Sequence, residues 1–197
     1  MLKRMARPRT HDHHVRRRLL EAASAAVAAR GASGLSLRST AQQASTTTAA
    51  VYSLFGSRDG LLAAVVEEGF RRFGTHLATV EKTAQPAEDL IALGVAYRKN
   101  ALENPHFYRV MFGPASSDIS SGRGEETFAV LVDAVARVVD CDAAQARLRA
   151  QRVWAYVHGL VSLELADLVP GSSSAGQAQE SYVAALRAAA SLLWGPA

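Results

Sequence analysis

Residues 37–62 read LRSTAQQASTTTAAVYSLFGSRDGLL and contain two short segments with small or apolar residues at helical spacing. Ser36 precedes the first segment and Thr47 starts the second, and each hydroxyl is expected to cap the helix that follows it. Gly56 is expected to end the second helix, and Ser57 to cap a longer helix beyond it. Since a turn of only two or three residues separates the two short helices, the stretch predicts a helix-turn-helix.

Longer helices are expected on both sides of this pair. The helix before it should begin at about Asp12, as N-cap, and run to about Arg30, with Gly31 as its stop. The helix after it should bury one apolar side, formed by Leu61, Leu62, Val65, Val66, Phe70, Phe73 and Leu77. A short turn forces the paired helices to cross steeply and leaves the second one projecting, as a helix that enters a DNA major groove must.

The remaining chain keeps the helical period to its end, and no Asn-Gly or Asp-Gly hairpin signal separates alternating apolar runs. Asn104 is expected to cap a short apolar helix that starts at Pro105, and Asp142 to cap a long one that ends near Asp167. Further helices are expected at about 86–101, 128–140 and 177–194, with loops at 115–124 and 170–176. The predicted fold class is therefore all-α, with about nine helices.

Charge is unevenly divided along the chain. Residues 1–60 hold ten Lys or Arg against three Asp or Glu, whereas residues 61–197 hold twelve against fifteen, so the net charges are +7 and −3. A basic first third indicates a polyanionic partner, although a solvated charged arm would have the same composition. Arg16 and Arg17, together with a basic arm at residues 1–11, can reach the phosphates of a nucleic acid.

The expected compartment is a reducing cytoplasm, because a single cysteine, Cys141, excludes an intrachain disulfide. Residues 16–18 are arginines that precede LLEAASAAVAA and imitate a signal peptide. However, Glu21 interrupts the apolar run, and the helical spacing favours an amphipathic helix. No run of eighteen apolar residues occurs, so neither a membrane-spanning helix nor a membrane partner is expected.

Few residues indicate catalysis or a cofactor. His11, Asp12, His13 and His14 are adjacent, and consecutive histidines on a helix cannot all face one metal ion. The sequence has neither a glycine-rich phosphate loop nor a set of nucleophile, base and orienting residue, so no metal and no cofactor are expected. The same absences disfavour a helical enzyme that would use His158 or the serine-rich loops.

The order and spacing of residues 37–62, with the helices beside them, closely resemble the DNA-binding domain of tetracycline-repressor-type (TetR-family) transcriptional regulators. The resemblance spans about residues 12–65. It implies that Thr47, Thr48 and Ala49 face the DNA groove. It also implies phosphate contacts for Arg38, Tyr52, Ser57 and Arg58.

Three positions depart from the family pattern. Ser45 stands where the turn usually has glycine, Thr46 where a small aliphatic residue is common, and Leu54 where histidine is frequent. A residue other than glycine with a positive φ at Ser45 carries a conformational cost. At Leu54 one phosphate contact of the family is expected to be missing.

The second half resembles the C-terminal domain of a Trp/His-Gly (WHG) subset of these regulators. The resemblance rests on YRKNALENPHFYRVMFG (97–113) and RVWAYVHGLVSLELADL (152–168). It implies that residues 59–197 dimerise and bind a small ligand, behind a helix-turn-helix domain at residues 12–58. The short helix near residue 110 has more aromatic residues than one packing face needs, so a set of side chains is expected to line a ligand pocket. These are Tyr97, Phe107, Tyr108, Met111, Phe112, Phe128, Trp154 and His158.

Core packing is the alternative for each of these side chains alone. Gly159 is expected to allow a close helix approach, either within the chain or across a dimer. The last two long helices are rich in leucine, at Leu160, Leu163, Leu186, Leu192 and Leu193, and could form a four-helix dimer interface or pack within the chain.

The sequence therefore predicts a regulator that binds double-stranded DNA as a homodimer. The expected target is a palindromic operator, and the expected action is repression that a small, largely apolar effector releases. A helical small-molecule-binding dimer without DNA binding stays open as an alternative.

Overall fold

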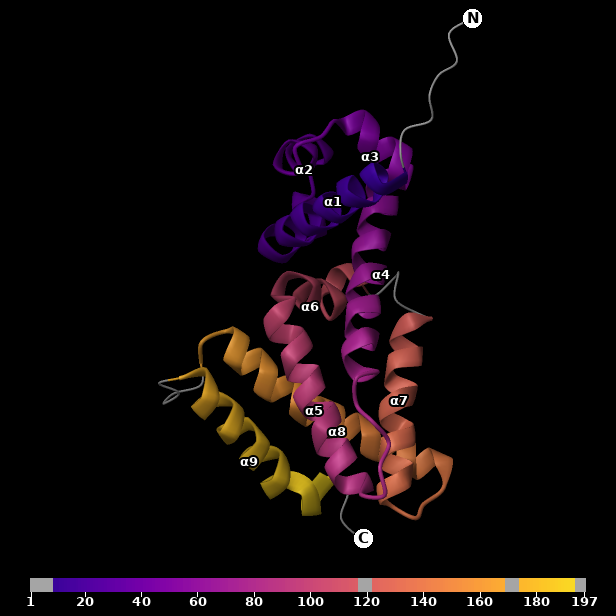
Figure 1. Cartoon of the computed structure of the whole chain (residues 1–197), viewed down its shortest axis with the longest axis vertical. Coiled ribbons are helices and arrows are strands. Elements are labelled where there is room, and N and C mark those ends of the chain that lie inside the picture. Colours follow the sequence, from indigo (N-terminus) through magenta and orange to yellow (C-terminus); the bar gives the residue numbers. More distant parts are fainter. Residues whose placement is uncertain (1–8, 117–121, 169–173, 194–197) are drawn as a thin grey trace, which may run out of the picture. The chain divides into compact units, whose positions relative to one another are not determined.

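The computed structural model describes residues 9–116, 122–168 and 174–193. These residues form nine α-helices, two short 3-10 turns and no strand, which confirms the predicted all-α fold (Figure 1). Residues 1–8 of the predicted basic arm lie outside the described residues. The same holds for residues 117–121 and 170–173 of the two predicted loops and for Trp194.

The described residues form two units. The first comprises those within Met1–Gly69 and His106–Ser121, and the second those within Phe70–Pro105 and Gly122–Ala197. Helix α4, Arg58–Leu77, contributes residues to both units. The sequence-based division into residues 12–58 and 59–197 stays a prediction.

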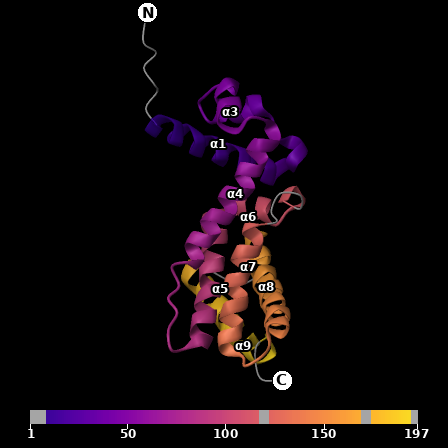
Figure 2. The same ribbon diagram turned by 90° about the vertical axis from the view of Figure 1, so that its right-hand side faces the viewer.

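The first unit contains the helix-turn-helix. Its elements are α1 (Arg9–Arg30), the 3-10 turn η1 (Ala32–Gly34), α2 (Leu37–Gln43), α3 (Thr48–Phe55), the start of α4, α6 (Pro105–Met111) and the 3-10 turn η2 (Pro114–Ser116). Helix α1 packs on α2 and η1, and α2 packs on α3 (Figure 2). Gly31 ends α1 as expected, with φ 71° and its N–H bonded to the Val27 carbonyl at 2.8 Å.

The start of α1 differs from the prediction. Asp12 lies within the first turn of a helix that begins at Arg9, so it is not the N-cap. The apolar pattern begins only at Val15, and a first turn of polar residues gives no periodic signal. A carboxylate in that turn still interacts favourably with the positive end of the helix dipole.

Helix α4 has the buried side that its sequence predicts. All seven expected side chains are at most 8% exposed, from Leu61 and Val65 at 0% to Leu77 at 8%. Four belong to the first unit and three to the second. Full burial of one such side chain contributes about 1.5–3 kcal/mol, so this row is a main source of stability in each unit.

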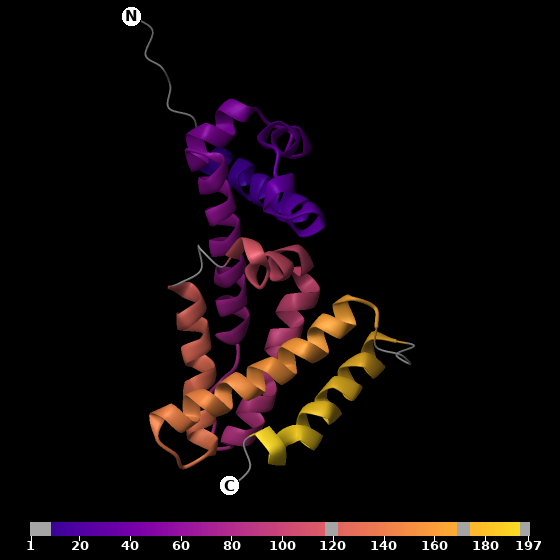
Figure 3. The same cartoon turned by 180° about the vertical axis from the view of Figure 1, so that it is seen from behind.

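In the second unit, α5 (Pro86–Glu103) packs against α7 (Arg123–Val138), α8 (Ala143–Leu165) and α9 (Ala175–Leu193). Figure 3 shows α8, in orange, between α7 and the yellow α9. Asp142 caps α8 as expected, because its Oδ1 accepts a hydrogen bond from the Gln145 N–H at 2.9 Å. Helix α7 begins earlier than predicted, since its first turn carries Glu125 and Glu126 and no apolar residue.

Polar contacts join the helices of the second unit. Arg98, on α5, donates to both carboxylate oxygens of Glu164 on α8, from Nε at 2.7 Å and from Nη2. The hydroxyl of Tyr182 donates to the Gly94 carbonyl at 2.9 Å and fixes α9 on α5. A Cβ at Gly94 would lie 2.7 Å from Leu186 Cδ1, so a larger residue there would force the buried Leu186 side chain to move.

Candidate nucleic-acid interface and aromatic cluster

The turn between α2 and α3 ends α2 without glycine. Ser45, which stands where the family usually has glycine, has a positive φ of 49°. The Ser45 N–H bonds to the Gln42 carbonyl at 3.0 Å, and the Thr46 N–H bonds to the Ala41 carbonyl at 2.9 Å. This pair of bonds is a Schellman motif, which satisfies the last carbonyls of α2 and turns the chain sharply toward α3.

Helix α3 presents its small and hydroxyl residues to solvent. Thr47 caps it as expected, accepting a hydrogen bond from the Ala50 N–H at 3.2 Å. Val51 is fully buried, whereas Thr48, Ala49 and Tyr52 are exposed, the tyrosine by 57%. The capped helix is therefore held by its buried side and offers three of the predicted groove-facing or phosphate-facing side chains.

Ser53 is also exposed on α3, one turn beyond Ala49. Ser53 was not among the predicted contact residues, although its spacing of four residues from Ala49 places it on the same face. Arg38 is exposed in the first turn of α2. The cap of α2 is Ser36, whose Oγ accepts from the Ser39 N–H at 3.4 Å.

Ser57 and Arg58 both have partners within the chain. The Ser57 Oγ accepts from the Gly60 N–H at 2.9 Å and caps α4 as expected. The Arg58 guanidinium donates from Nε to the Leu35 carbonyl at 3.1 Å and from Nη2 to the Ala32 carbonyl. Its Nη1 lies 3.3 Å from Asp59 Oδ1. Most of the Arg58 donors therefore face the protein.

The arginines of α1 also have neighbours on the protein. The Cζ atom of Arg16 lies 5.6 Å from the ring centroid of Phe55, which is half-buried. Arg17 Nη2 lies 3.2 Å from His14 Nδ1, and Arg18 Nε donates to the Ala44 carbonyl at 2.9 Å. An open depression of about 360 Å³ is lined by Arg17, Arg18, Glu21, Ala22 and Gln43.

Four of the eight predicted pocket residues come together in the second unit. Tyr97 Oη lies 2.9 Å from His158 Nδ1, and the ring centroids of Trp154 and His158 are 6.3 Å apart. Phe128 lies 5.9 Å from Trp154, and Phe73, which was expected only in the core, lies 5.1 Å from Tyr97. We call Phe73, Tyr97, Phe128, Trp154 and His158 the aromatic cluster.

The cluster is partly open to solvent. Trp154 is 38% exposed, and Phe128 is half-buried. Burial lowers the pKa of His158 because desolvation disfavours the imidazolium ion. A neutral His158 suits a site for an uncharged or largely apolar molecule.

The other four predicted pocket residues belong to the first unit. Phe107 and Met111 are 2% exposed, Tyr108 is 4% exposed, and Phe112 is half-buried. A Cβ at Gly69 would lie 2.6 Å from Met111 Cγ, so α4 and α6 are in close contact there. Their burial fits core packing, and a role in ligand binding stays a prediction.

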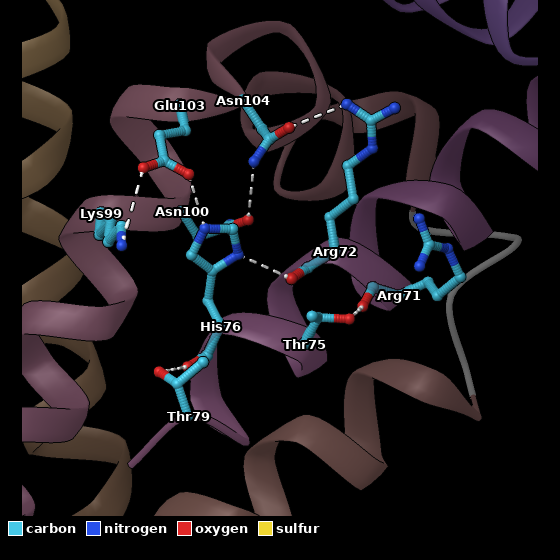
Figure 4. A network of polar contacts seen from close by, with 9 residues as sticks. All are labelled: Arg71, Arg72, Thr75, His76, Thr79, Lys99, Asn100, Glu103 and Asn104. Atoms are coloured by element: carbon cyan, nitrogen blue, oxygen red, sulfur yellow. Dashed lines mark hydrogen bonds and ion pairs between the residues drawn. The ribbon is translucent and has the colours of Figure 1, made fainter.

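A polar network joins the end of α4 to the end of α5 (Figure 4). Arg72 Nη1 donates to Asn104 Oδ1 at 2.9 Å, and Asn104 Nδ2 donates to Asn100 Oδ1 at 3.3 Å. His76 faces Glu103 and the Arg72 carbonyl, both at 2.9 Å. Asn104, the expected cap of α6, thus uses its side-chain oxygen to hold α4.

The described part of the chain offers neither a metal site nor a single membrane-spanning helix. No group of three or more His, Cys, Asp or Glu side chains there could hold a metal ion. No single helix there is long and apolar enough to cross a membrane. Helices α3 and α4, which meet at a 66° bend, are long and apolar enough only when taken together, as the core helices of a protein can also be.

Comparisons with known proteins agree with this architecture. A family model described as bacterial regulatory proteins, tetR family, matches residues 19–65. A model described as tetracyclin repressor-like, C-terminal domain, matches residues 90–189. A search of curated protein sequences gave no match.

Solved structures of similar fold include regulators. SCO4313, described as a regulatory protein, has 27% sequence identity and a TM-score of 0.72, over 97% of this chain and 100% of its own. PfmR, a TetR family transcriptional regulator from Thermus thermophilus, has 19% identity and a TM-score of 0.68, over 91% of this chain and 99% of its own.

Proposed function

Because the chain belongs to the tetracycline-repressor (TetR) family of transcriptional regulators, and so is a regulator and not an enzyme, we propose that it is a ligand-responsive repressor. It acts in the cytoplasm as a homodimer on a palindromic operator. A small, largely apolar molecule releases it from the DNA. The proposed DNA binding rests on the arrangement of α3. This helix is capped by Thr47 and held by the buried Val51. Its side chains Thr48, Ala49 and Tyr52 are exposed.

In this proposal, α3 enters the major groove. Thr48 and Ala49 contact base edges, where a methyl group can meet the thymine methyl. Tyr52 and Arg38 contact phosphates and set the register of the protein on the duplex. Thr47 already uses its hydroxyl oxygen as a cap, so its contribution to the groove is its methyl group.

Three more side chains add to the phosphate contacts of each protomer. Ser57 keeps its hydroxyl hydrogen available, because the cap uses the oxygen as an acceptor. Arg16 and Arg17 contribute charge from α1. These contacts carry no sequence information themselves, and they make binding depend steeply on salt.

The proposed dimer interface is the solvent-facing side of α8 with the neighbouring side of α9. Gly159 supports it, because a Cβ at that position would meet nothing within 4 Å in this chain. Gly159 was expected to allow another helix to come close. Among the described residues, no helix of the same chain occupies the space beside it. Leu148 and Leu163 lie on the same side of α8 and are 50% and 47% exposed.

On α9, the small residues Ala184 and Ala188 are exposed one turn apart. Two copies of α8 and α9 would bury these positions in a four-helix interface.

The aromatic cluster of the second unit is the proposed effector site, with the Tyr97–His158 pair as its polar group. Few polar groups among aromatic rings favour an effector that is mostly apolar.

Selection of binding sites from a random duplex library at low salt tests the proposal. The selected sequences should be palindromic, with half-sites centred about one DNA turn apart. The logarithm of the affinity should fall linearly with the logarithm of the salt concentration, with a slope of about −0.9 for each phosphate contacted. If the protein is dimeric but binds no duplex at low salt, the proposed DNA binding is wrong. The alternative, a small-molecule-binding dimer, would then be favoured.

A further inference from the structure

Arg58 is the first residue of α4 and is bonded to the connection between α1 and α2. Its Nε donates to the Leu35 carbonyl at 3.1 Å, and its Nη2 donates to the Ala32 carbonyl. These acceptors are 23 and 26 residues away in sequence. One edge of the planar guanidinium thus binds two backbone carbonyls, a geometry that lysine cannot reproduce.

The two carbonyls belong to a connection that sets where α2 begins. Ala32 is the first residue of η1, and its carbonyl also accepts the Leu35 N–H at 3.2 Å. Leu35 is 3% exposed and directly precedes Ser36, the cap of α2. Hydrogen bonds from a cation to these carbonyls are stronger than those between neutral groups. They therefore tie the start of α2 to the start of α4.

The start of α4 is also the end of α3. Gly56, with φ 75°, ends α3, and Ser57 follows as the cap of α4. The Arg58 bonds thus close a loop of chain that contains all of α2 and α3. Loss of these bonds would let both DNA-facing helices shift together relative to α4.

The remaining edge of Arg58 is poorly suited to a phosphate. Its Nη1 lies 3.3 Å from Asp59 Oδ1, and the Asp59 side chain is 87% exposed. The carboxylate neutralises part of the guanidinium charge and would repel a phosphate placed beside it. The Arg58 side chain itself is 38% exposed.

We propose that Arg58 is a positioning residue for DNA binding, which fixes α2 and α3 through the Leu35 and Ala32 carbonyls, and does not contact phosphate. The proposal rests on the proposed function, and it replaces the phosphate contact that the family resemblance implies for this residue.

The salt dependence of DNA binding separates the two roles. The variants are Arg58→Gln and Arg58→Lys, with Arg38→Gln as a matched control on the proposed DNA face. Affinities for the selected operator are measured over a range of salt concentrations. The temperature is one at which circular dichroism shows every variant as helical as the wild type.

For a positioning residue, Arg58→Gln and Arg58→Lys lose affinity to a similar extent, about tenfold, because both lose the two-carbonyl fork. The salt slope of both stays that of the wild type. Arg38→Gln lowers the slope by about 0.9 for each protomer. Near wild-type affinity for Arg58→Lys, with a slope lowered by about 0.9 per protomer for Arg58→Gln, would overturn the inference.

A measurement on the wild type covers the case in which the Arg58 variants do not fold. The Arg58 Nε–H resonance should be visible in the ¹⁵N spectrum without DNA, because the Leu35 carbonyl slows its exchange with water. It should not move when the operator is added. A resonance that appears only with DNA would contradict the positioning role. Absence of operator binding by the wild type would instead contradict the proposed function.

Discussion

His76 Nε2 lies 2.9 Å from Glu103 Oε2, and His76 Nδ1 lies 2.9 Å from the Arg72 carbonyl oxygen (Figure 4). Both neighbours of the ring are hydrogen-bond acceptors, so each ring nitrogen that carries a proton has a partner to donate to. The contact joins the last turn of α4 to the last turn of α5. It is reinforced one turn earlier on α4 by the bond from Arg72 to Asn104.

A double-mutant cycle should find measurable coupling between His76 and Glu103. The side chains are 18% and 53% exposed, so solvent screens the pair and the expected coupling is about 0.5 kcal/mol. Urea unfolding of His76→Ala, Glu103→Ala and the double variant gives this value. The control pair is Lys82 with Asp133, at 4.0 Å and with side chains 69% and 72% exposed, for which coupling near zero is expected. Equal coupling for both pairs would show that the His76 geometry adds nothing.

Ser45→Gly should stabilise the protein. Ser45 has φ 49°, a conformation that costs a residue with a Cβ about 1–2 kcal/mol, whereas glycine adopts it freely. Part of the gain is lost because glycine has more conformational entropy in the unfolded chain, so the net increase in unfolding free energy should be about 0.5–1 kcal/mol.

Thermal or urea unfolding measures the effect of Ser45→Gly. The matched control is Ser53→Gly within α3, which should lower the unfolding free energy by about 0.5 kcal/mol because glycine has a lower helix propensity than serine. Destabilisation by both variants would mean that the Ser45 side chain contributes a contact that outweighs its conformational cost.

Thr47 should contribute to the stability of the protein, and Thr48 to its base preference. Thr47→Ala removes the cap of α3 and should lower the unfolding free energy by about 1 kcal/mol. Thr48→Ala should change it by less than about 0.5 kcal/mol, because Thr48 is exposed. Only Thr48→Ala should alter the base preference in a binding-site selection. An unchanged selection profile for Thr48→Ala would remove that side chain from the proposed base contacts.

The pKa of Asp89 is lowered by hydrogen bonds from Thr83 and by the bond and charge of Arg137. The Thr83 Oγ1 and N–H donate at 2.7 and 2.8 Å, and Arg137 Nη1 at 2.8 Å. A folded-state pKa below the unfolded value of about 3.9 means that the stabilisation is fully present above that value. It is lost as the pH falls through the folded-state pKa.

The pH dependence of this stabilisation can be measured with Asp89→Asn. Its unfolding free energy is compared with that of the wild type between pH 7 and about pH 2. The difference in favour of the wild type should be constant above about pH 5 and should shrink below about pH 4. Asp133→Asn is the control, because the Asp133 side chain is 72% exposed and its nearest cation, Lys82, is 4.0 Å away. It should show almost no difference at any pH. A gap for Asp89→Asn that persists at low pH would mean that the hydrogen bonds, and not the charge, carry the stabilisation.

The caps were predictable from sequence because a cap is a local arrangement. Ser36, Thr47, Ser57 and Asp142 each accept a hydrogen bond from an N–H three residues later, and the chain spacing alone brings these atoms together. The positive φ of Ser45 did not follow from such spacing, since only the family resemblance, with glycine at this turn position, pointed to it. The start of α7 was not predictable, because its first turn has no apolar residue to show the helical period.

Contacts between distant segments could not be read from sequence. Arg58 reaches carbonyls of a connection 23 and 26 residues away, and only the packed fold decides that its guanidinium turns toward them. Phe73 was predicted as one of seven core residues on α4, and nothing in that pattern distinguishes the one whose ring meets Tyr97. Sequence periodicity tells which side of a helix is buried, but not which partner covers it.

Gly159→Glu should separate the dimer without unfolding the chain. A side chain at Gly159 meets nothing within 4 Å, so the variant should keep the helicity and unfolding behaviour of the isolated subunit. Two buried carboxylates facing each other in a four-helix interface would each lose hydration, at a cost of several kcal/mol. Light scattering after size-exclusion chromatography should show a shift from dimer to monomer, and operator affinity should fall with it.

Gly94→Ala is the contrasting variant, because its Cβ would lie 2.7 Å from Leu186 Cδ1 within the same chain. It should lower the unfolding temperature and leave the subunit association of the folded protein unchanged. A fully dimeric, operator-binding Gly159→Glu protein would place the interface on another surface. A Gly159→Glu protein that is monomeric and as helical as the wild type would identify this side of α8 as the one that a second copy covers.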